Sequence, residues 1–212
     1  MLLANVVVDF FIKGGPIMYP ILVVAVVAVC VVVERVFWWS NTAIKRNPKL
    51  LESVYETLES GDLDHAMKLS AGANDPVVRL VHHGLSHPHT SMEGALEVAA
   101  GREIRVAGRF LSAMDTIVTL GPLLGLLGTV TGIMGSFSSI GSAELAVEKV
   151  TGGIGEALIA TAAGLGIAIG TLIPMNYFHS RLASLQFDLE AAANNVLILA
   201  ERLGLGDGKK KS

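Results

Sequence analysis

Residues 116–143 read TIVTLGPLLGLLGTVTGIMGSFSSIGSA, and this stretch contains no Asp, Glu, Lys or Arg. Residues 14–33 and 157–178 share that property. A helix of about 20 residues crosses the hydrocarbon core of a bilayer, so each stretch is long enough. Lipid offers no hydrogen bonds to the backbone, and these runs lack the alternation of a membrane barrel. We therefore predict an all-α, polytopic membrane protein with three transmembrane helices.

The composition of the whole chain favours the same class. Apolar residues make up 51% of the chain and charged residues 17%, whereas a soluble domain usually carries about a quarter charged residues. The lone Cys30 lies in the first apolar stretch, so an intramolecular disulfide is excluded. The sequence contains no phosphate loop, nucleophile elbow, zinc motif or nucleic-acid-binding module. We expect no enzyme activity, no cofactor, no metal and no nucleic acid partner.

The basic residues lie on one side of the three expected spans. They follow the first span, precede the second and follow the third, at Lys45, Arg46, Lys49, Arg102, Arg105, Arg109, Arg181 and residues 209–211. The segments on the other side hold only Lys13 and Lys149. The positive-inside rule then places the amino terminus outside and the carboxyl terminus in the cytoplasm. Glu34 and Arg35 close the first span and are expected to mark the membrane interface, where an Arg side chain can snorkel.

This topology divides the chain into six segments. They are an outer amino terminus with the first transmembrane helix (1–40), a cytoplasmic helical segment (41–112), the second transmembrane helix (113–141), a short outer loop (142–152), the third transmembrane helix (153–178) and a cytoplasmic carboxyl-terminal helix with a basic tail (179–212).

Cap signals divide the segment 41–112 into short helices. Asn47, Asp62 and Asp75 are expected N-caps, and Thr90 with Glu93 forms a capping box. We expect the last of these helices to continue into the second span as one rod. The segment is too small to bury much core alone, so it should pack on helix extensions or on neighbouring subunits.

A histidine cluster in the same segment could suggest a metal site. His82, His83, His87 and His89 lie close in sequence, but Pro88 divides them and no Cys or acidic ligand is interleaved at a suitable spacing. We interpret the cluster as a solvated loop.

A stripe of small residues follows the second expected span. Gly121, Gly125, Gly132 and Ser136 repeat at spacings of four and seven, with Thr129 between them. Such stripes let another helix approach closely, so packing is the first interpretation. A hydroxyl at Thr129 can also hydrogen-bond an ion, a water or a partner carboxyl, so a role in an ion pathway stays open.

The third expected span places one carboxyl on a face of small residues. Gly152, Glu156, Ala160, Gly164 and Ala168 are each four residues apart. An ionisable group in a span is costly and usually faces a bundle interior or a water-filled cavity, where it often serves ions or protons. The alternative is a structural carboxylate at headgroup level, stabilised by the positive end of the helix dipole. The sequence pattern leaves both interpretations open.

Two segments carry a family resemblance. Residues 121–134, GPLLGLLGTVTGIM, and residues 155–165, GEALIATAAGL, closely resemble the paired signatures of the ExbB/TolQ/MotA proton-channel family. MotA proteins usually have four spans, so three spans resemble the ExbB/TolQ branch. Gly153 and Gly170 stand where this family usually has Pro, and Pro174 follows one turn later, so the kink of the third helix is expected to differ.

The resemblance implies a function, a location and partners. In that family five copies form a ring in the bacterial inner membrane, and the lumen holds single-span helices of an ExbD/TolR/MotB-type protein. Proton flow past the partner's aspartate drives a motor, with membrane lipid around the ring and a TonB/TolA-like protein as a further partner. By motif match, Thr129 and Thr161 correspond to lumen threonines, and Glu156 corresponds to the intramembrane glutamate.

Two other functions remain compatible with the sequence. A structural membrane scaffold would use Gly121, Gly125, Gly132, Gly152, Ala160 and Gly164 for helix packing only. A self-sufficient ion channel would work without a motor partner. A neighbouring gene for a short single-span protein with an intramembrane Asp would favour the motor.

Overall fold

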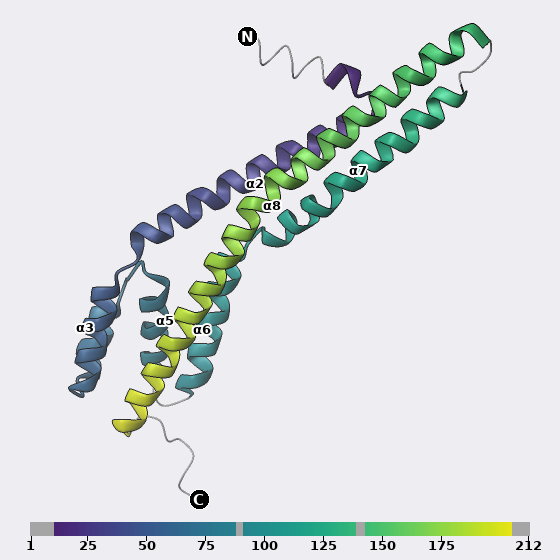
Figure 1. Cartoon of the computed structure of the whole chain (residues 1–212). Coiled ribbons are helices and arrows are strands. Elements are labelled where there is room, and N and C mark those ends of the chain that lie inside the picture. Colours follow the sequence, from purple (N-terminus) through teal and green to yellow (C-terminus); the bar gives the residue numbers. More distant parts are fainter. Residues whose placement is uncertain (1–10, 88–90, 139–142, 205–212) are drawn as a thin grey trace, which may run out of the picture. The chain divides into compact units, whose positions relative to one another are not determined.

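The computed structural model describes residues 11–87, 91–138 and 143–204, and every regular element within these ranges is an α-helix. The helices are α2 (Met18–Lys45), α3 (Pro48–Glu59), α4 (Leu63–Ser70), α5 (Pro76–Leu85), α6 (Met92–Ala107), α7 (Leu111–Ser138) and α8 (Ala143–Arg202) (Figure 1). Three helical stretches, Met18–Lys45, Met92–Ser138 and Val150–Arg202, are long and apolar enough to cross a membrane. The predicted all-α fold with three spans is confirmed.

The chain forms two compact units, each built from segments that are distant in the sequence. Unit 1 contains Met1–Arg35 and Phe110–Tyr177, and unit 2 contains Val36–Arg109 and Phe178–Ser212. The long helices α2 and α8 each contribute to both units. Residues 143–152, expected in an outer loop, already belong to α8, since Ala, Glu and Leu in this stretch are strong helix formers.

Unit 1 leaves many large apolar side chains on its surface. On α7 and α8 these include Leu123, Leu126, Val130, Met134, Ile154, Leu158, Leu165 and Ile169. Soluble monomers rarely expose contiguous apolar surfaces of this kind. The surface of unit 1 is therefore suited to lipid or to other membrane helices.

The charged side chain of Arg35 is buried inside unit 1 and has two partners there. Only 1% of the residue is exposed. Its Nη2 donates to Glu34 Oε1 at 2.8 Å, and its guanidinium carbon lies 5.7 Å from the centroid of the Phe110 ring. A paired and stacked guanidinium can stay buried. The expectation that Glu34 and Arg35 mark the membrane interface stays a prediction.

The expected continuous rod from the cytoplasmic segment into the second span is wrong. Helix α6 ends at Ala107, where the Gly108 N–H caps the Ile104 carbonyl at 2.8 Å, and α7 begins at Leu111. Between them, Phe110 adopts a φ of +66°, in the left-handed region. A non-glycine residue rarely adopts this conformation, and here the cation–π contact with Arg35 holds its ring.

Unit 2 contains the end of α2, helices α3 to α6 and the last part of α8. Three predicted caps are confirmed: Asn47 Oδ1 accepts from the Leu50 N–H at 3.1 Å, Asp62 accepts from His65, and Asp75 accepts from Val77. The N-cap of α6 is Ser91, while Thr90 lies outside the described residues. The buried apolar side chains come from every helix of the unit, including Val54, Leu58, Ala66, Val77, Leu80, Leu96, Leu189 and Val196.

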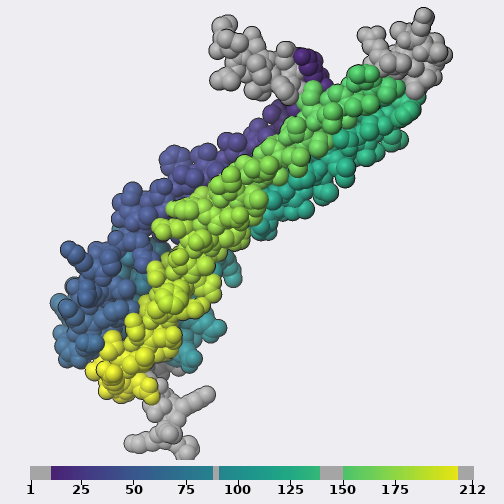
Figure 2. Space-filling view, in the orientation of Figure 1, coloured from purple at the N-terminus to yellow at the C-terminus, as the bar shows by residue number. Residues whose placement is uncertain are grey.

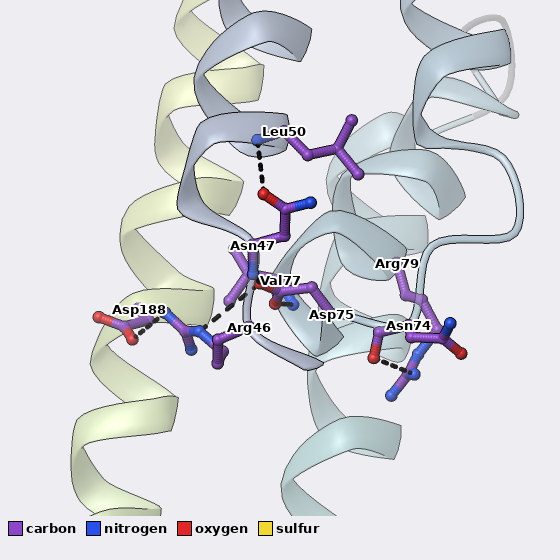
Figure 3. A network of polar contacts seen from close by, with 8 residues as sticks. All are labelled: Arg46, Asn47, Leu50, Asn74, Asp75, Val77, Arg79 and Asp188. Atoms are coloured by element: carbon purple, nitrogen blue, oxygen red, sulfur yellow. Dashed lines mark hydrogen bonds and ion pairs between the residues drawn. The ribbon is translucent and has the colours of Figure 1, made fainter. Parts of the chain in front are cut away.

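A polar network joins three parts of unit 2 (Figure 3). Asp75 is only 3% exposed, and its carboxylate accepts from the Asn47 N–H at 2.6 Å and from the Val77 N–H at 2.9 Å. Arg46 lies with its Nε 3.6 Å from Asp75 Oδ2 and donates from Nη2 to Asp188 Oδ2 at 2.8 Å. The network therefore links the end of α2, the start of α5 and α8.

The histidines of the sequence cluster do not all lie in a loop. His82 and His83 belong to the last turn of α5, and His82 Nδ1 lies 3.0 Å from Ser70 Oγ. His89 and residues 209–211 lie outside the described residues. In the part of the chain that the structure describes, no three His, Cys, Asp or Glu side chains gather to hold a metal ion.

Candidate functional site

Glycines bring α7 and α8 into backbone contact within unit 1. A Cβ atom at Gly121 would lie 2.8 Å from the Gly164 oxygen, and one at Gly125 would lie 2.9 Å from Thr161 Cα. A Cβ atom at Gly164 would overlap the Gly121 oxygen. The surfaces of α7 and α8 meet along this line of glycine contacts, which we call the seam (Figure 2). Any larger residue at these positions would push the helices apart.

The seam continues past Gly125, and it includes one glycine outside the predicted stripe. A Cβ atom at Gly132 would lie 3.2 Å from Ala157 Cβ, in tight contact. One at Gly128 would lie 2.6 Å from Ala160 Cβ and 2.9 Å from Ile17 Cγ2. The sequence offered no signal for Gly128, because Ile17 contacts it from a distant part of the chain. The packing of α7 thus involves the segment before α2 as well as α8.

Gly152 is the predicted packing residue that the structure does not bring into the seam. A Cβ atom placed there would meet no other atom of the described residues within 4 Å. Its neighbour Gly153 instead contacts Ser136, since a Cβ atom at Gly153 would overlap the Ser136 hydroxyl. The absence of a proline ring at position 153 therefore leaves room for Ser136.

The two predicted lumen threonines have different environments. Thr161 is half-buried, and its Oγ1 donates to the Gly125 carbonyl at 2.9 Å and to the Ala157 carbonyl at 3.1 Å. Thr129 is also half-buried, but its Oγ1 donates only within its own helix, to Leu126 at 2.7 Å. Thr161 therefore connects two helices, whereas Thr129 does not.

Glu156 lies at the wall of an open cavity of about 600 Å³ in unit 1. The other residues at this cavity come from the segment before α2, from α7 and from α8, and they are Pro16, Ile17, Thr131, Gly132, Gly135, Ser136 and Gly153. Neither Thr129 nor Thr161 is among them. The cavity therefore brings Glu156 together with the hydroxyls of Thr131 and Ser136.

The Glu156 carboxylate rests on the backbone of Gly15. A Cβ atom at Gly15 would overlap the carboxylate, and the φ of Gly15 is +70°, in the region that favours glycine. Both the backbone conformation and the space therefore require glycine at this position. Sequence reasoning missed Gly15, because nothing local in the sequence relates it to Glu156.

The hydroxyls at the cavity can accept further hydrogen bonds. Thr131 Oγ1 donates to the Leu127 carbonyl at 2.9 Å, and Ser136 Oγ donates to the Gly132 carbonyl at 2.8 Å. Each oxygen keeps lone pairs, so a water or a protonated carboxyl can donate to it. A carboxyl, two hydroxyls and space for water can together take part in proton transfer.

Comparison with known proteins identifies similar chains. A family model described as the MotA/TolQ/ExbB proton channel family matches residues 72–191, a range that includes α7 and Glu156. The chain is 38% identical over 173 residues to the putative biopolymer transport protein ExbB-like 3 of Synechocystis sp., which covers 79% of this chain and 82% of that protein.

Two further relatives carry other names. The Tol-Pal system protein TolQ of Pseudomonas aeruginosa is 31% identical over 189 residues, covering 80% of this chain and 82% of its own. The biopolymer transport protein ExbB of Neisseria meningitidis is 28% identical over 213 residues, covering 88% of this chain and 93% of its own. These matches extend over most of each chain and are not confined to the two motifs.

Proposed function

The chain belongs to the MotA/TolQ/ExbB proton channel family, and we propose that it is the ring-forming channel subunit of an ExbB/TolQ-like motor driven by the proton-motive force. It is a multi-pass inner-membrane protein, as the family and the three apolar helices support. In this function, ion flow is coupled to mechanical work on the cell envelope or to transport. By the positive-inside rule, the amino terminus is periplasmic and the carboxyl terminus cytoplasmic.

The position of Glu156 is the observation that carries this proposal. Its carboxyl is half-buried in a membrane-spanning helix and lies at a cavity with Thr131 and Ser136. Holding a carboxylate away from water costs free energy, so a half-buried carboxyl in a membrane-spanning helix favours a role in proton transfer. One charge crossing 100 mV releases about 2.3 kcal/mol. That amount can bias a conformational step without unfolding a unit whose stability is about 5–15 kcal/mol.

A ring is required for a lumen, because the described residues of one copy offer three spans. Three helices do not enclose a space wide enough for another helix. Exposed apolar side chains such as Leu126 and Leu158 support contacts between copies or with lipid. Contacts between identical copies usually close into a ring with cyclic symmetry. The family resemblance sets the number of copies at five. In the proposed homopentamer, the second and third spans form the inner wall, and the first span faces lipid.

The lumen of this ring would hold a single-span protein of the ExbD/TolR/MotB type. Its intramembrane aspartate would lie near Thr129 and Thr161, and a change in its charge would alter its hydrogen bonds to the ring. The names of the ExbB and TolQ relatives support such a partnership. A TonB-like or TolA-like protein would then transmit the movement.

Native mass spectrometry and proton flux together test this function. The chain should be co-expressed with the short single-span protein of a neighbouring gene and purified in mild detergent. We expect five copies with the added mass of the partner. A monomer or dimer as the sole species, where a known ring of this family survives, would contradict the proposal.

Flux is measured with a pH-sensitive dye in vesicles that contain the assembled complex. Glu156→Ala should abolish flux without changing the mass of the ring, and Thr129→Val with Thr161→Val should lower it strongly. Glu201→Ala is the control, because Glu201 is exposed in the last turn of α8. Wild-type flux in Glu156→Ala would leave Glu156 as a structural carboxylate.

A further inference from the structure

Unit 2 contains a polar cavity of about 350 Å³ that the proposed function does not use. One wall is the end of α2, with Trp39 and Thr42, and Arg46 directly after it, and the other wall is α8, with Arg181, Ser184 and Asp188. The residues on each helix are three or four apart, so each wall is one helix face.

Three side chains that line this cavity have donor groups with no acceptor among the described residues. The Arg181 guanidinium lies over the Trp39 ring, 6.0 Å from its centroid, and forms no ion pair with a described carboxylate. The Thr42 hydroxyl has no partner among the described residues. Trp39 is only 7% exposed, and its Nε1 is buried without an acceptor in the described part of the chain. Of the three, only Trp39 Nε1 is buried, and a buried donor without an acceptor is costly. The half-buried Thr42 hydroxyl and the exposed Arg181 guanidinium can donate to a ligand with acceptor atoms.

Two of the polar side chains at the cavity, Asp188 and Ser184, already take part in hydrogen bonds within the protein. Asp188 Oδ2 accepts from Arg46 Nη2 at 2.8 Å, and the Arg46 Nε also lies 3.6 Å from Asp75. Ser184 Oγ donates to the Ser180 carbonyl at 3.0 Å. Arg181 forms no ion pair with Asp188, which is paired with Arg46, and its exposed side chain can move off the indole. The cavity is suited to an anion with several oxygens, which is the chemistry of a phosphate group.

We propose that this cavity binds the phosphate of an anionic phospholipid, with phosphatidylglycerol as the probe. A lipid is favoured over a soluble phosphate by position. The cavity lies at the last two turns of the membrane-spanning helix α2, the level at which Trp and basic residues meet headgroups. On the same turns of α2, Phe37 is 73% exposed and Ile44 is 83% exposed, so apolar surface for acyl chains is close at hand. The proposal requires the membrane location and does not depend on proton conduction.

Native mass spectrometry of the purified oligomer, titrated with lipid, tests this site. Dioleoyl phosphatidylglycerol should bind more tightly than dioleoyl phosphatidylcholine. Arg181→Gln should weaken phosphatidylglycerol binding about fivefold, the effect of one basic charge near a lipid surface, and leave phosphatidylcholine binding unchanged. Arg202→Gln is the matched control, because Arg202 is an exposed arginine on the same helix, outside the cavity.

Trp39→Phe and Thr42→Val each remove one hydrogen-bond donor without changing the charge. If Arg181→Gln fails to fold, these two variants test whether the cavity binds phosphatidylglycerol. Both should weaken phosphatidylglycerol binding, and millimolar inorganic phosphate should not compete. Equal binding of the two lipids, or wild-type phosphatidylglycerol binding in Arg181→Gln and Thr42→Val, would overturn the proposal. Displacement of the lipid by inorganic phosphate would assign the cavity to a soluble anion and overturn the lipid site.

Discussion

The Thr161 hydroxyl donates a hydrogen bond to the Gly125 carbonyl at 2.9 Å, and this bond joins α8 to α7. The contact depends on the missing side chain of Gly125, because a Cβ atom there would lie only 2.9 Å from Thr161 Cα. Close approach and hydrogen bonding thus occur at the same point of the seam. Small residues and interhelical hydrogen bonds are the usual sources of helix association in membranes.

Thr161→Val should destabilise the folded chain more than Thr129→Val. The first change removes a bond between helices, while the second removes only a bond to Leu126 within α7. We expect a difference of about 0.5–1 kcal/mol per copy, the usual size of such bonds in membrane proteins. Thermal unfolding in the same detergent, followed by circular dichroism, measures it. Equal melting temperatures would show that the bond to Gly125 adds no stability.

Gly164→Ala should separate α7 from α8, whereas Gly166→Ala should not. A Cβ atom at Gly164 would overlap the Gly121 oxygen and lie 3.1 Å from the Gly125 nitrogen. At Gly166 it would meet nothing within 4 Å among the described residues. We expect Gly164→Ala to cost about 1–3 kcal/mol, the range for overpacked sites. Chemical denaturation in detergent measures the unfolding free energy of both variants. Equal losses of stability would show that the contact between α7 and α8 is not the reason why Gly164 is needed.

Gly15→Ala should impair proton flux by displacing the Glu156 carboxylate. Alanine at this position would meet the carboxylate and would also have to adopt a φ of +70°. Gly72→Ala is the control for the backbone effect, because Gly72 has a φ of +71° and no neighbour within 4 Å in the described chain. Both variants should lose about 1 kcal/mol of stability, but only Gly15→Ala should lose flux in vesicles. Normal flux in Gly15→Ala would mean that the position of the Glu156 carboxylate against Gly15 does not affect proton conduction.

The stability of unit 2 should fall above about pH 10 because of Tyr55. Burial raises the pKa of the Tyr55 phenol above its ordinary value of 10.0, while a hydrogen bond with Asn195 lowers the pKa by a smaller amount. The folded chain therefore keeps this proton at a pH where the unfolded chain loses it. The stabilisation is complete below about pH 10 and is lost as the pH rises through the folded pKa.

Tyr55→Phe removes this titration, so its melting temperature should fall less than that of the wild type between pH 8 and pH 11. Other groups titrate in the same range, and the comparison of the two proteins cancels their contributions. If the melting temperatures of both proteins fell equally, Tyr55 would be excluded as a cause of the loss of stability at alkaline pH.

The sequence by itself determined the features that depend on neighbouring residues. Charge-free stretches predict the three spans, because the bilayer core excludes charge over about 20 residues of helix. Asn47, Asp62 and Asp75 predict helix starts, because an N-cap side chain reaches a backbone N–H only two or three residues away. Glu156 stood out for the same local reason, as a lone carboxyl on a face of small residues.

Only the tertiary structure decided which distant residues meet. It placed Gly15 against Glu156, and Ile17 against Gly128, across more than half of the chain. It also buried Arg35 over the Phe110 ring, beside the break between α6 and α7 that replaced the expected rod. Such contacts result from the packing of whole helices, in which each residue's neighbours are set by the crossing of helix axes and not by spacing along the chain.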